Sequence, residues 1–122
     1  MSITQGGIKM KLPKKVAAWS EVQFLLVLSD GRKWGFMEIT KKLHLQVSPT
    51  SQLFISKLAA PLCQRGLVKG GGGITYQITG AGLAWLEQEG LEVFRQTFNP
   101  PPGLIESLGP DKLAALKKLA EV

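Results

Sequence analysis

The chain has 122 residues, of which 44% are hydrophobic and 20% are charged. This mixture is typical of one folded domain and excludes a disordered chain. No apolar run reaches the ~18 residues that cross a bilayer, and the N-terminus shows no secretory signal. A single cysteine excludes an internal disulfide and favours a cytoplasmic location. One cysteine and one histidine cannot supply a typical zinc site.

Positive charge is concentrated in the first part of the chain. Residues 1–69 hold 11 Lys and Arg against 3 Asp and Glu, whereas residues 70–122 hold 4 against 6. The net charges are therefore +8 and −2. Such an asymmetry indicates one side that faces a polyanion and another side with a different use. The alternative is that the lysines only keep the chain soluble.

Residues 1–15 are rich in lysine, contain two glycines and a proline, and have no regular period. We predict a flexible basic arm here. The lysines of this arm are Lys9, Lys11, Lys14 and Lys15. Ser20 is a good N-cap for a first helix over the apolar run 21–28, which is expected to be buried on more than one side. Asp30-Gly31 ends it.

Two further helices follow. Phe36, Ile39 and Leu43 recur at helical spacing and predict a short helix over 36–44, with His44 as a partner of its C-terminal dipole. Ser48-Pro49 starts the next helix, which runs to residue 65. Its buried stripe is Ile55, Leu58, Ala59 and Leu62, and its opposite face is Thr50, Leu53, Lys57, Ala60 and Gln64. Pro61 is expected to kink this helix or to end its regular hydrogen-bond ladder, and Gly66 is expected to be its C-terminal stop.

Four glycines, residues 70–73, separate a short apolar strand at 67–69 from the alternating ITYQI at 74–78. The alternation predicts a strand with Ile74, Tyr76 and Ile78 on its buried side. A phosphate-binding loop would need a lysine after the glycines, and none follows. The dinucleotide-binding glycine pattern and its βαβ unit are also missing. The glycines are therefore interpreted as the tip of a hairpin.

Thr79 caps a further helix, and residues 99–103, NPPPG, break the chain after it. The predicted inner face of this helix is Leu83, Leu86, Val93 and Phe94, with Trp85 pointing outward. The last helix, over 111–121, is marginal alone in water, so it must dock on this chain or on another copy. A homodimer that pairs the terminal helices is favoured slightly over a helix that folds back.

Helices, a hairpin and then a helix occur in this order together with RGLV at 65–68 and YQITGAG at 76–82. From Trp19 to Gln88 the chain resembles the bacterial MarR/PadR-type winged helix-turn-helix regulators. The resemblance implies an α+β winged helix-turn-helix fold with three helices, a two-stranded β-hairpin wing and further C-terminal helices. The domain would span 16–98, between the arm at 1–15 and a Pro-rich linker with the C-terminal helix at 99–122. The resemblance also implies a cytoplasmic protein of a bacterium, archaeon or phage.

The implied function is double-stranded DNA binding by a small dimeric transcriptional regulator, with helix 48–65 in the major groove. Thr50, Ser51 and Gln52 are polar candidates for base contacts. Gln52 suits adenine, and Leu53 suits a thymine methyl group. The expected phosphate contacts are Arg32, Lys33, Lys41, Lys42, Lys57 and Lys69, supplemented by the basic arm.

Other functions remain open. The predicted recognition face has no arginine, and Leu53 could equally contact a protein, so a winged-helix adaptor in a larger assembly is the main alternative. A nonspecific DNA-architectural or replication accessory protein is the third. A single histidine and sparse carboxylates predict no enzyme, and no cofactor or small-molecule ligand is evident. Cys63 is expected to be a small, partly buried hydrophobic residue.

Overall fold

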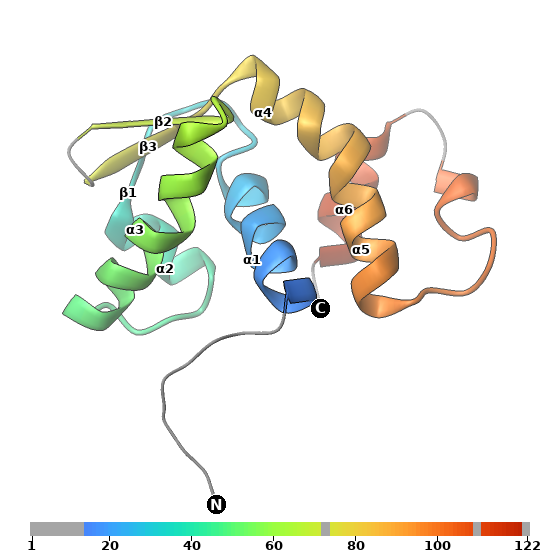
Figure 1. Ribbon diagram of the computed structural model, residues 1–122, viewed down its shortest axis with the longest axis horizontal. Helices are drawn as coiled ribbons and strands as arrows, with labels where there is room; N and C mark the ends of the chain where they lie inside the picture. The colour runs from blue at the N-terminus through green and yellow to red at the C-terminus, as the bar shows by residue number, and fades with distance from the viewer. Residues whose placement is uncertain (1–13, 72–73, 109–110, 121–122) are drawn as a thin grey trace, which may run out of the picture.

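The computed structural model describes residues 14–71, 74–108 and 111–120, which form an α+β fold (Figure 1). The elements in chain order are α1 (Lys14–Val27), β1 (Trp34–Gly35), α2 (Phe36–Lys42), α3 (Pro49–Gln64), β2 (Val68–Gly71), β3 (Thr75–Ile78), α4 (Gly80–Trp85), the π-helix η1 (Leu86–Gly90), α5 (Leu91–Phe98), the 3₁₀-helix η2 (Glu106–Leu108) and α6 (Lys112–Ala120). Helix α1 lies in the middle, with α2, α3 and the sheet on one side and α5 and α6 on the other. The predicted α+β class is confirmed.

Helix α1 forms the centre of the core. Its Val22, Phe24 and Leu25 are fully buried, because α1 packs against α2 and α3 on one side and against η1 and α5 on the other. A helix with neighbours on both sides needs apolar residues around most of its surface. The prediction that this helix is buried on more than one side is therefore confirmed.

The predicted start of this helix at Ser20 is wrong, because α1 already begins at Lys14. Trp19 lies in the earlier part, and its ring packs on Phe94 and Phe98 of α5, with centroid distances of 5.4 and 5.0 Å. The two alanines before Trp19 favour a helix. This tertiary contact and the local propensity outweigh the capping signal of Ser20, which lies inside the helix.

Helices α2 and α3 match the sequence prediction closely. Helix α2 ends two residues before the predicted boundary. Helix α3 begins at Pro49 after the N-cap Ser48, whose hydroxyl accepts a hydrogen bond of 3.2 Å from the Ser51 N–H. All members of the predicted stripe are buried: Ile55, Leu58, Ala59 and Leu62. Pro61 stays within the helix, and Gly66 follows its end with a φ of 75°.

The sheet contains the predicted hairpin and one additional strand. Strands β2 and β3 are antiparallel, with Val68 opposite Ile78. Strand β1 pairs with the other edge of β3 through Trp34 and Tyr76, so the order is β1-β3-β2 and the predicted two strands become three. A two-residue strand is too short to show a period in sequence. Tyr76 and Ile78 are buried as predicted, whereas Ile74 precedes β3 and is 61% exposed.

Helices α4, η1 and α5 run on without a break, and Thr79 caps the start as predicted by accepting a hydrogen bond from the Gly82 N–H. Two glycines inside this run allow other segments to approach closely. A Cβ at Gly82 would collide with the backbone oxygen of Leu67, and a Cβ at Gly90 would lie 2.8 Å from Leu116 Cδ2. The α3–β2 connection and α6 therefore lie close against the long helix at these two glycines.

The inner face of this helix is partly as predicted. Leu86 and Phe94 are buried, whereas Leu83 and Val93 are half-buried. Leu91, which was not predicted, is buried as well. The wider π turn rotates the residues that follow it relative to a regular α-helix, and a simple 3.6-residue period cannot anticipate that rotation.

The chain turns back after α5. Asn99 ends that helix in the left-handed region, with a φ of 48°. Helix α6 then packs against η1 and buries Leu116 completely, so the C-terminal helix docks on its own chain. Within the described residues, no helix is long and apolar enough to cross a membrane.

Candidate nucleic-acid interface

The outer face of α3 is an exposed stripe. Its predicted members are all exposed: Thr50, Leu53, Lys57, Ala60 and Gln64. Gln52 is exposed beside them, and 56% of Leu53 is open to solvent. The first turns of this helix therefore present a hydroxyl, an amide, an apolar side chain and an ammonium group to the surroundings.

Ser51 is not part of this face. The residue is 9% exposed, and its hydroxyl donates a hydrogen bond to the backbone oxygen of Gln46. The hydroxyl also lies 3.1 Å from that of Ser48. This burial corrects the predicted place of Ser51 among the exposed polar readers, because its side chain fastens the α2–α3 connection to the start of α3.

The connection between α2 and α3 begins with a left-handed residue, His44, whose φ is 61°. The His44 N–H donates to the Lys41 oxygen at 3.0 Å, and the Leu45 N–H donates to the Thr40 oxygen at 2.9 Å. These two bonds form a Schellman cap, which usually carries glycine at the left-handed position. His44 lies at the helix end as predicted, but it ends the helix through its backbone.

Among the described residues around α2, α3 and the sheet, the cationic side chains that form no ion pair are lysines. The exposed lysines are Lys33, Lys41, Lys42, Lys57 and Lys69. None of them takes part in an ion pair between described residues. Glu38 is the one acidic residue between positions 34 and 79. Lys42 also lines a groove that it shares with Lys117 of α6, so it faces partly away from α3.

The basic arm divides at the start of α1. Lys14 and Lys15 are the first two residues of that helix, which corrects the prediction of a flexible arm over residues 1–15 at its end. Lys9 and Lys11 lie outside the described residues. Their predicted contact with phosphate or the minor groove stays a prediction.

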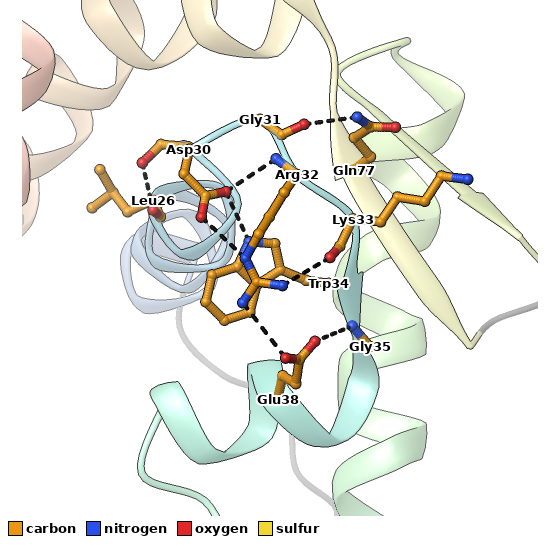
Figure 2. A network of polar contacts seen from close by, with 10 residues as sticks. Leu26, Asp30, Gly31, Arg32, Lys33, Trp34, Gly35, Glu38 and Gln77 are labelled. Atoms are coloured by element: carbon orange, nitrogen blue, oxygen red, sulfur yellow. Dashed lines mark hydrogen bonds and ion pairs between the residues drawn. The ribbon is translucent and has the colours of Figure 1, made fainter.

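Arg32 is held in a polar network between α1, β1 and α2 (Figure 2). Its Nε lies 3.3 Å from Asp30 Oδ2 and its Nη2 lies 3.5 Å from Glu38 Oε2. Its guanidinium carbon lies 3.9 Å from the centre of the Trp34 ring. Arg32 pairs with two carboxylates and in this way braces the α1–α2 connection. Its predicted contact with phosphate stays a prediction.

The carboxylates of this network accept further hydrogen bonds. Asp30 Oδ1 accepts 2.9 Å from the Trp34 indole N–H, and Glu38 Oε1 accepts 3.0 Å from the Gly35 backbone N–H. The Trp34 indole is the main cause that lowers the pKa of Asp30, and the Gly35 N–H is the main cause for Glu38. Arg32 lowers the pKa of both. Both groups therefore stay ionised near neutral pH.

The other two arginines are paired as well. Arg65 Nη1 lies 3.2 Å from Glu21 Oε1, and its guanidinium carbon lies 5.1 Å from the Trp85 ring centre. Trp85, predicted to point outward, is half-buried in this position. Arg95 Nη2 lies 2.7 Å from Glu106 Oε2. All arginines of the chain thus have carboxylate partners.

A small hollow of about 270 Å³ lies on the outer face of the sheet. Lys33 and Lys69 line it together with Thr75, Gln77 and their neighbours on β2 and β3. Lys69 lies opposite Gln77 across the hairpin, and the Gln77 amide donates 2.7 Å to the Gly31 oxygen. The alternation in ITYQI indicates that Thr75 and Gln77 face outward, but Lys33 joins them only through the unpredicted β1.

Cys63 on α3 is exposed rather than partly buried as predicted. Desolvation of the thiol raises its pKa, which disfavours the reactive thiolate.

Among the residues that the structure describes, no three His, Cys, Asp or Glu side chains are grouped to hold a metal ion. Comparison with family models, curated proteins and solved structures finds no match for this chain.

Proposed function

We propose that this protein is a winged helix-turn-helix DNA-binding protein, a small transcriptional regulator that inserts α3 into the major groove of duplex DNA. Helices α2 and α3 are the helix-turn-helix in this proposal, and the β2–β3 hairpin is the wing. The observation that carries this proposal is the exposed outer face at the start of α3. The cationic side chains around it that form no ion pair between described residues are all lysines.

The chemistry of this face suits base edges. Gln52 can donate to and accept from adenine in the major groove, and Leu53 can pack on a thymine methyl group. Thr50 precedes them by half a turn, where its hydroxyl can contact either a base edge or a phosphate. Because recognition helices read bases with their N-terminal residues, the well-fixed start of α3 supports this orientation.

The unpaired lysines supply the attraction to phosphate. The candidates for these contacts are Lys33, Lys41, Lys42, Lys57 and Lys69. If all five neutralise one phosphate each, the logarithm of the binding constant falls with the logarithm of salt concentration with a slope of about −4.5 for each chain. A lysine ammonium that contacts phosphate acts as a point charge and selects no base, so sequence preference depends on Thr50, Gln52 and Leu53.

The proposal includes a homodimer that binds two half-sites about one helical turn apart. Helix α6 buries Leu116 on its own chain, so its apolar face is already covered. Phe98, which is half-exposed and contacts Trp19 edge-on, offers an apolar surface for the pairing. Sedimentation equilibrium gives the mass of the parent protein and of Phe98→Ser in solution. Equal masses for the two contradict a role of Phe98 in dimerisation.

A protein adaptor is the second candidate, and a specific observation favours it. Leu53 exposes more apolar surface than a purely electrostatic DNA face requires, and Met37 and Ile74 are also more than half exposed. Exposed apolar side chains of this kind are common in protein-docking surfaces. An adaptor would show at most weak binding to DNA that disappears at moderate salt.

A fluorescence-anisotropy titration separates the two. A random-sequence duplex pool is titrated with the protein at two salt concentrations, and the duplexes that stay bound to the protein are sequenced. Lys57→Ala is compared with Lys112→Ala, an exposed lysine of α6 whose loss changes the net charge equally. We expect Lys57→Ala to weaken binding to all sequences and to reduce the salt slope by about one, whereas Lys112→Ala binds like the parent protein.

The sequenced fraction tests the reading of bases. An enriched motif that loses its preference at one position in Gln52→Ala supports the major-groove placement of α3. The discrimination lost at that position should be about 1–3 kcal/mol. Binding weaker than ~10⁻⁴ M, the weak end of nonspecific affinity, overturns the DNA-binding proposal. Equal effects of Lys57→Ala and Lys112→Ala overturn the placement of α3.

A further inference from the structure

Ile74 places an apolar side chain in the turn of the β2–β3 hairpin, just before β3 begins. It is 61% exposed, more than any other of the exposed large hydrophobic side chains that the structure describes. The four residues before it in sequence are glycines, which have no side chain that could cover it. Tyr76 and Ile78 of the same alternation are buried. The packing of the hairpin therefore does not account for an isoleucine at position 74.

The backbone around Ile74 is fixed by other elements of the fold. The Ile74 oxygen accepts a hydrogen bond of 2.9 Å from the Phe36 N–H at the start of α2. The next residue, Thr75, pairs with Gly71 of β2 and with Gly35 of β1. The β-branched side chain is itself stiff at χ1. Because both are already ordered, little conformational entropy is lost when a partner buries this side chain.

The charge around this end of the sheet is positive. Lys33 and Lys69 line the hollow on the outer face of the hairpin and belong to no ion pair between described residues. Glu38, near the start of α2, is paired with Arg32. In Figure 1, the ends of β2 and β3 that lead into the turn lie on the same side of the molecule as the start of α3, away from α5 and α6. Both therefore face a polyanion that is held along this side.

We propose that Ile74 enters duplex DNA as a wedge between two stacked base pairs and kinks the duplex. The inference rests on the proposed DNA binding by α3 and adds a distortion of the DNA to it. Isoleucine is among the apolar side chains that DNA-bending proteins insert between base steps. Removing its exposed surface from water offsets part of the cost of unstacking. Attraction of the lysines for phosphate holds the bent duplex against the protein.

The wedge predicts a feature of the DNA sequence that no hydrogen bond reads. An isoleucine side chain has no polar group, so it selects a base step by how easily that step unstacks. Pyrimidine–purine steps, TA and CA/TG, are the most easily kinked. We therefore expect such a step in the duplexes that stay bound to the protein, at a constant distance from the base that Gln52 contacts in the proposed complex.

The test uses a duplex of about 30 base pairs taken from the bound fraction of the random-sequence pool, with a donor and an acceptor dye at its ends. Energy transfer between the dyes measures the bend. The fluorescent base 2-aminopurine, placed at the pyrimidine–purine step, becomes brighter when it unstacks. Ile74→Thr keeps the β-branched shape and makes it polar, whereas Ile74→Leu keeps a wedge residue. Val47→Thr is the matched control, because Val47 is an exposed β-branched residue of the α2–α3 connection.

We expect the parent protein to bend the duplex by about 20–90°, the range for apolar wedges, and to brighten 2-aminopurine. Ile74→Leu and Val47→Thr should do the same. Ile74→Thr should leave the duplex nearly straight, abolish the increase in fluorescence and bind about tenfold more weakly, because one aliphatic side chain is no longer buried. The urea unfolding midpoint of Ile74→Thr should equal that of the parent, since position 74 is exposed.

The outcomes separate this inference from the proposed function. If the parent protein binds no DNA, both are overturned. A bound duplex that stays straight overturns the wedge alone, and so does an equal bend with the parent and with Ile74→Thr. Equal losses in Ile74→Thr and Val47→Thr overturn the assignment of the wedge to Ile74. The sequence preference lost in Gln52→Ala is measured independently, so failure of the wedge leaves the placement of α3 untouched.

Discussion

Gly82 and Gly80 lie two residues apart at the start of α4, and alanine at these positions should have opposite effects. Helix propensity alone predicts that both substitutions stabilise the protein, each by up to ~1 kcal/mol. A Cβ at Gly80 meets no atom within 4 Å. A Cβ at Gly82 would collide with the backbone oxygen of Leu67 and lie 2.7 Å from Ile78 Cγ1.

The cost at Gly82 can be worked out from these contacts. Overpacking by one methyl group usually costs about 1–3 kcal/mol. The Leu67 oxygen also accepts the Thr79 N–H at 3.0 Å, and displacing that oxygen weakens a hydrogen bond worth about 1 kcal/mol. After the propensity gain of about 1 kcal/mol, Gly82→Ala should lower the free energy of unfolding by about 2 kcal/mol. Gly80→Ala should raise it slightly.

Urea unfolding followed by circular dichroism measures both variants against the parent protein. The unfolding midpoint should fall for Gly82→Ala and stay equal or rise for Gly80→Ala, with an unchanged slope m in each case. In a thermal scan the loss corresponds to about 8 °C for a chain of this size. If Gly82→Ala is as stable as Gly80→Ala, the close approach of α4 to the α3–β2 connection is refuted.

Three further predictions use the same unfolding assay. His44→Gly should stabilise the protein by about 1 kcal/mol, because the left-handed backbone costs a non-glycine residue roughly that much; a lower midpoint would show that the imidazole contributes more than the strain costs. Asp30→Asn should flatten the pH dependence of the unfolding midpoint. The folded-state pKa of Asp30 lies below its ordinary value of 3.8. The ionised carboxylate therefore stabilises the protein above that value, and this contribution is lost as the pH falls through the lower folded-state pKa. Midpoints at pH 6 and pH 3 should therefore differ less in Asp30→Asn than in the parent, and equal differences would contradict the network. Leu116→Ala should cost about 2–5 kcal/mol because Leu116 is fully buried, and the loss should not depend on protein concentration if α6 docks on its own chain.

Local sequence signals were sufficient to predict the elements in which apolar residues recur at one regular spacing. The cap at Ser48 and the four buried positions of α3 follow from serine-proline chemistry and 3.6-residue spacing, and the structure confirms both. The hairpin follows from alternation around the glycines, without any tertiary information. The exposed face of α3 was predictable for the same reason, since it is the complement of the buried stripe.

Features that depend on contacts distant in sequence could not be predicted. Strand β1 exists because Trp34 pairs with Tyr76 across 42 positions of sequence, and two residues carry no period. Helix α1 starts early because Trp19 packs on α5. Composition likewise could not show that Arg32 is neutralised by Asp30 and Glu38, because the sequence gives the charge of a side chain but not its ion-pair partner.

Ser51 shows the same limit within one helix turn. Its residue type and position suit a base contact as well as those of Thr50 do. The difference is that the chain before α3 brings the Gln46 oxygen to the Ser51 hydroxyl. That approach is a property of the connecting loop, for which the sequence offers no regular pattern.

The division of cations into paired arginines and unpaired lysines has a chemical consequence. A lysine ammonium loses its charge when its nitrogen is acylated, whereas a guanidinium engaged with a carboxylate keeps both its charge and its structural bond. Partial acetylation of the protein would therefore remove the charges of Lys33, Lys41, Lys42, Lys57 and Lys69 one amine at a time and leave the ion pairs of Arg32 and Arg65 intact. In the proposed complex with DNA, each amine lost from a phosphate contact would lower the salt slope by about 0.9, so the proposed attraction for DNA would be reduced in graded steps while the fold stays as it is.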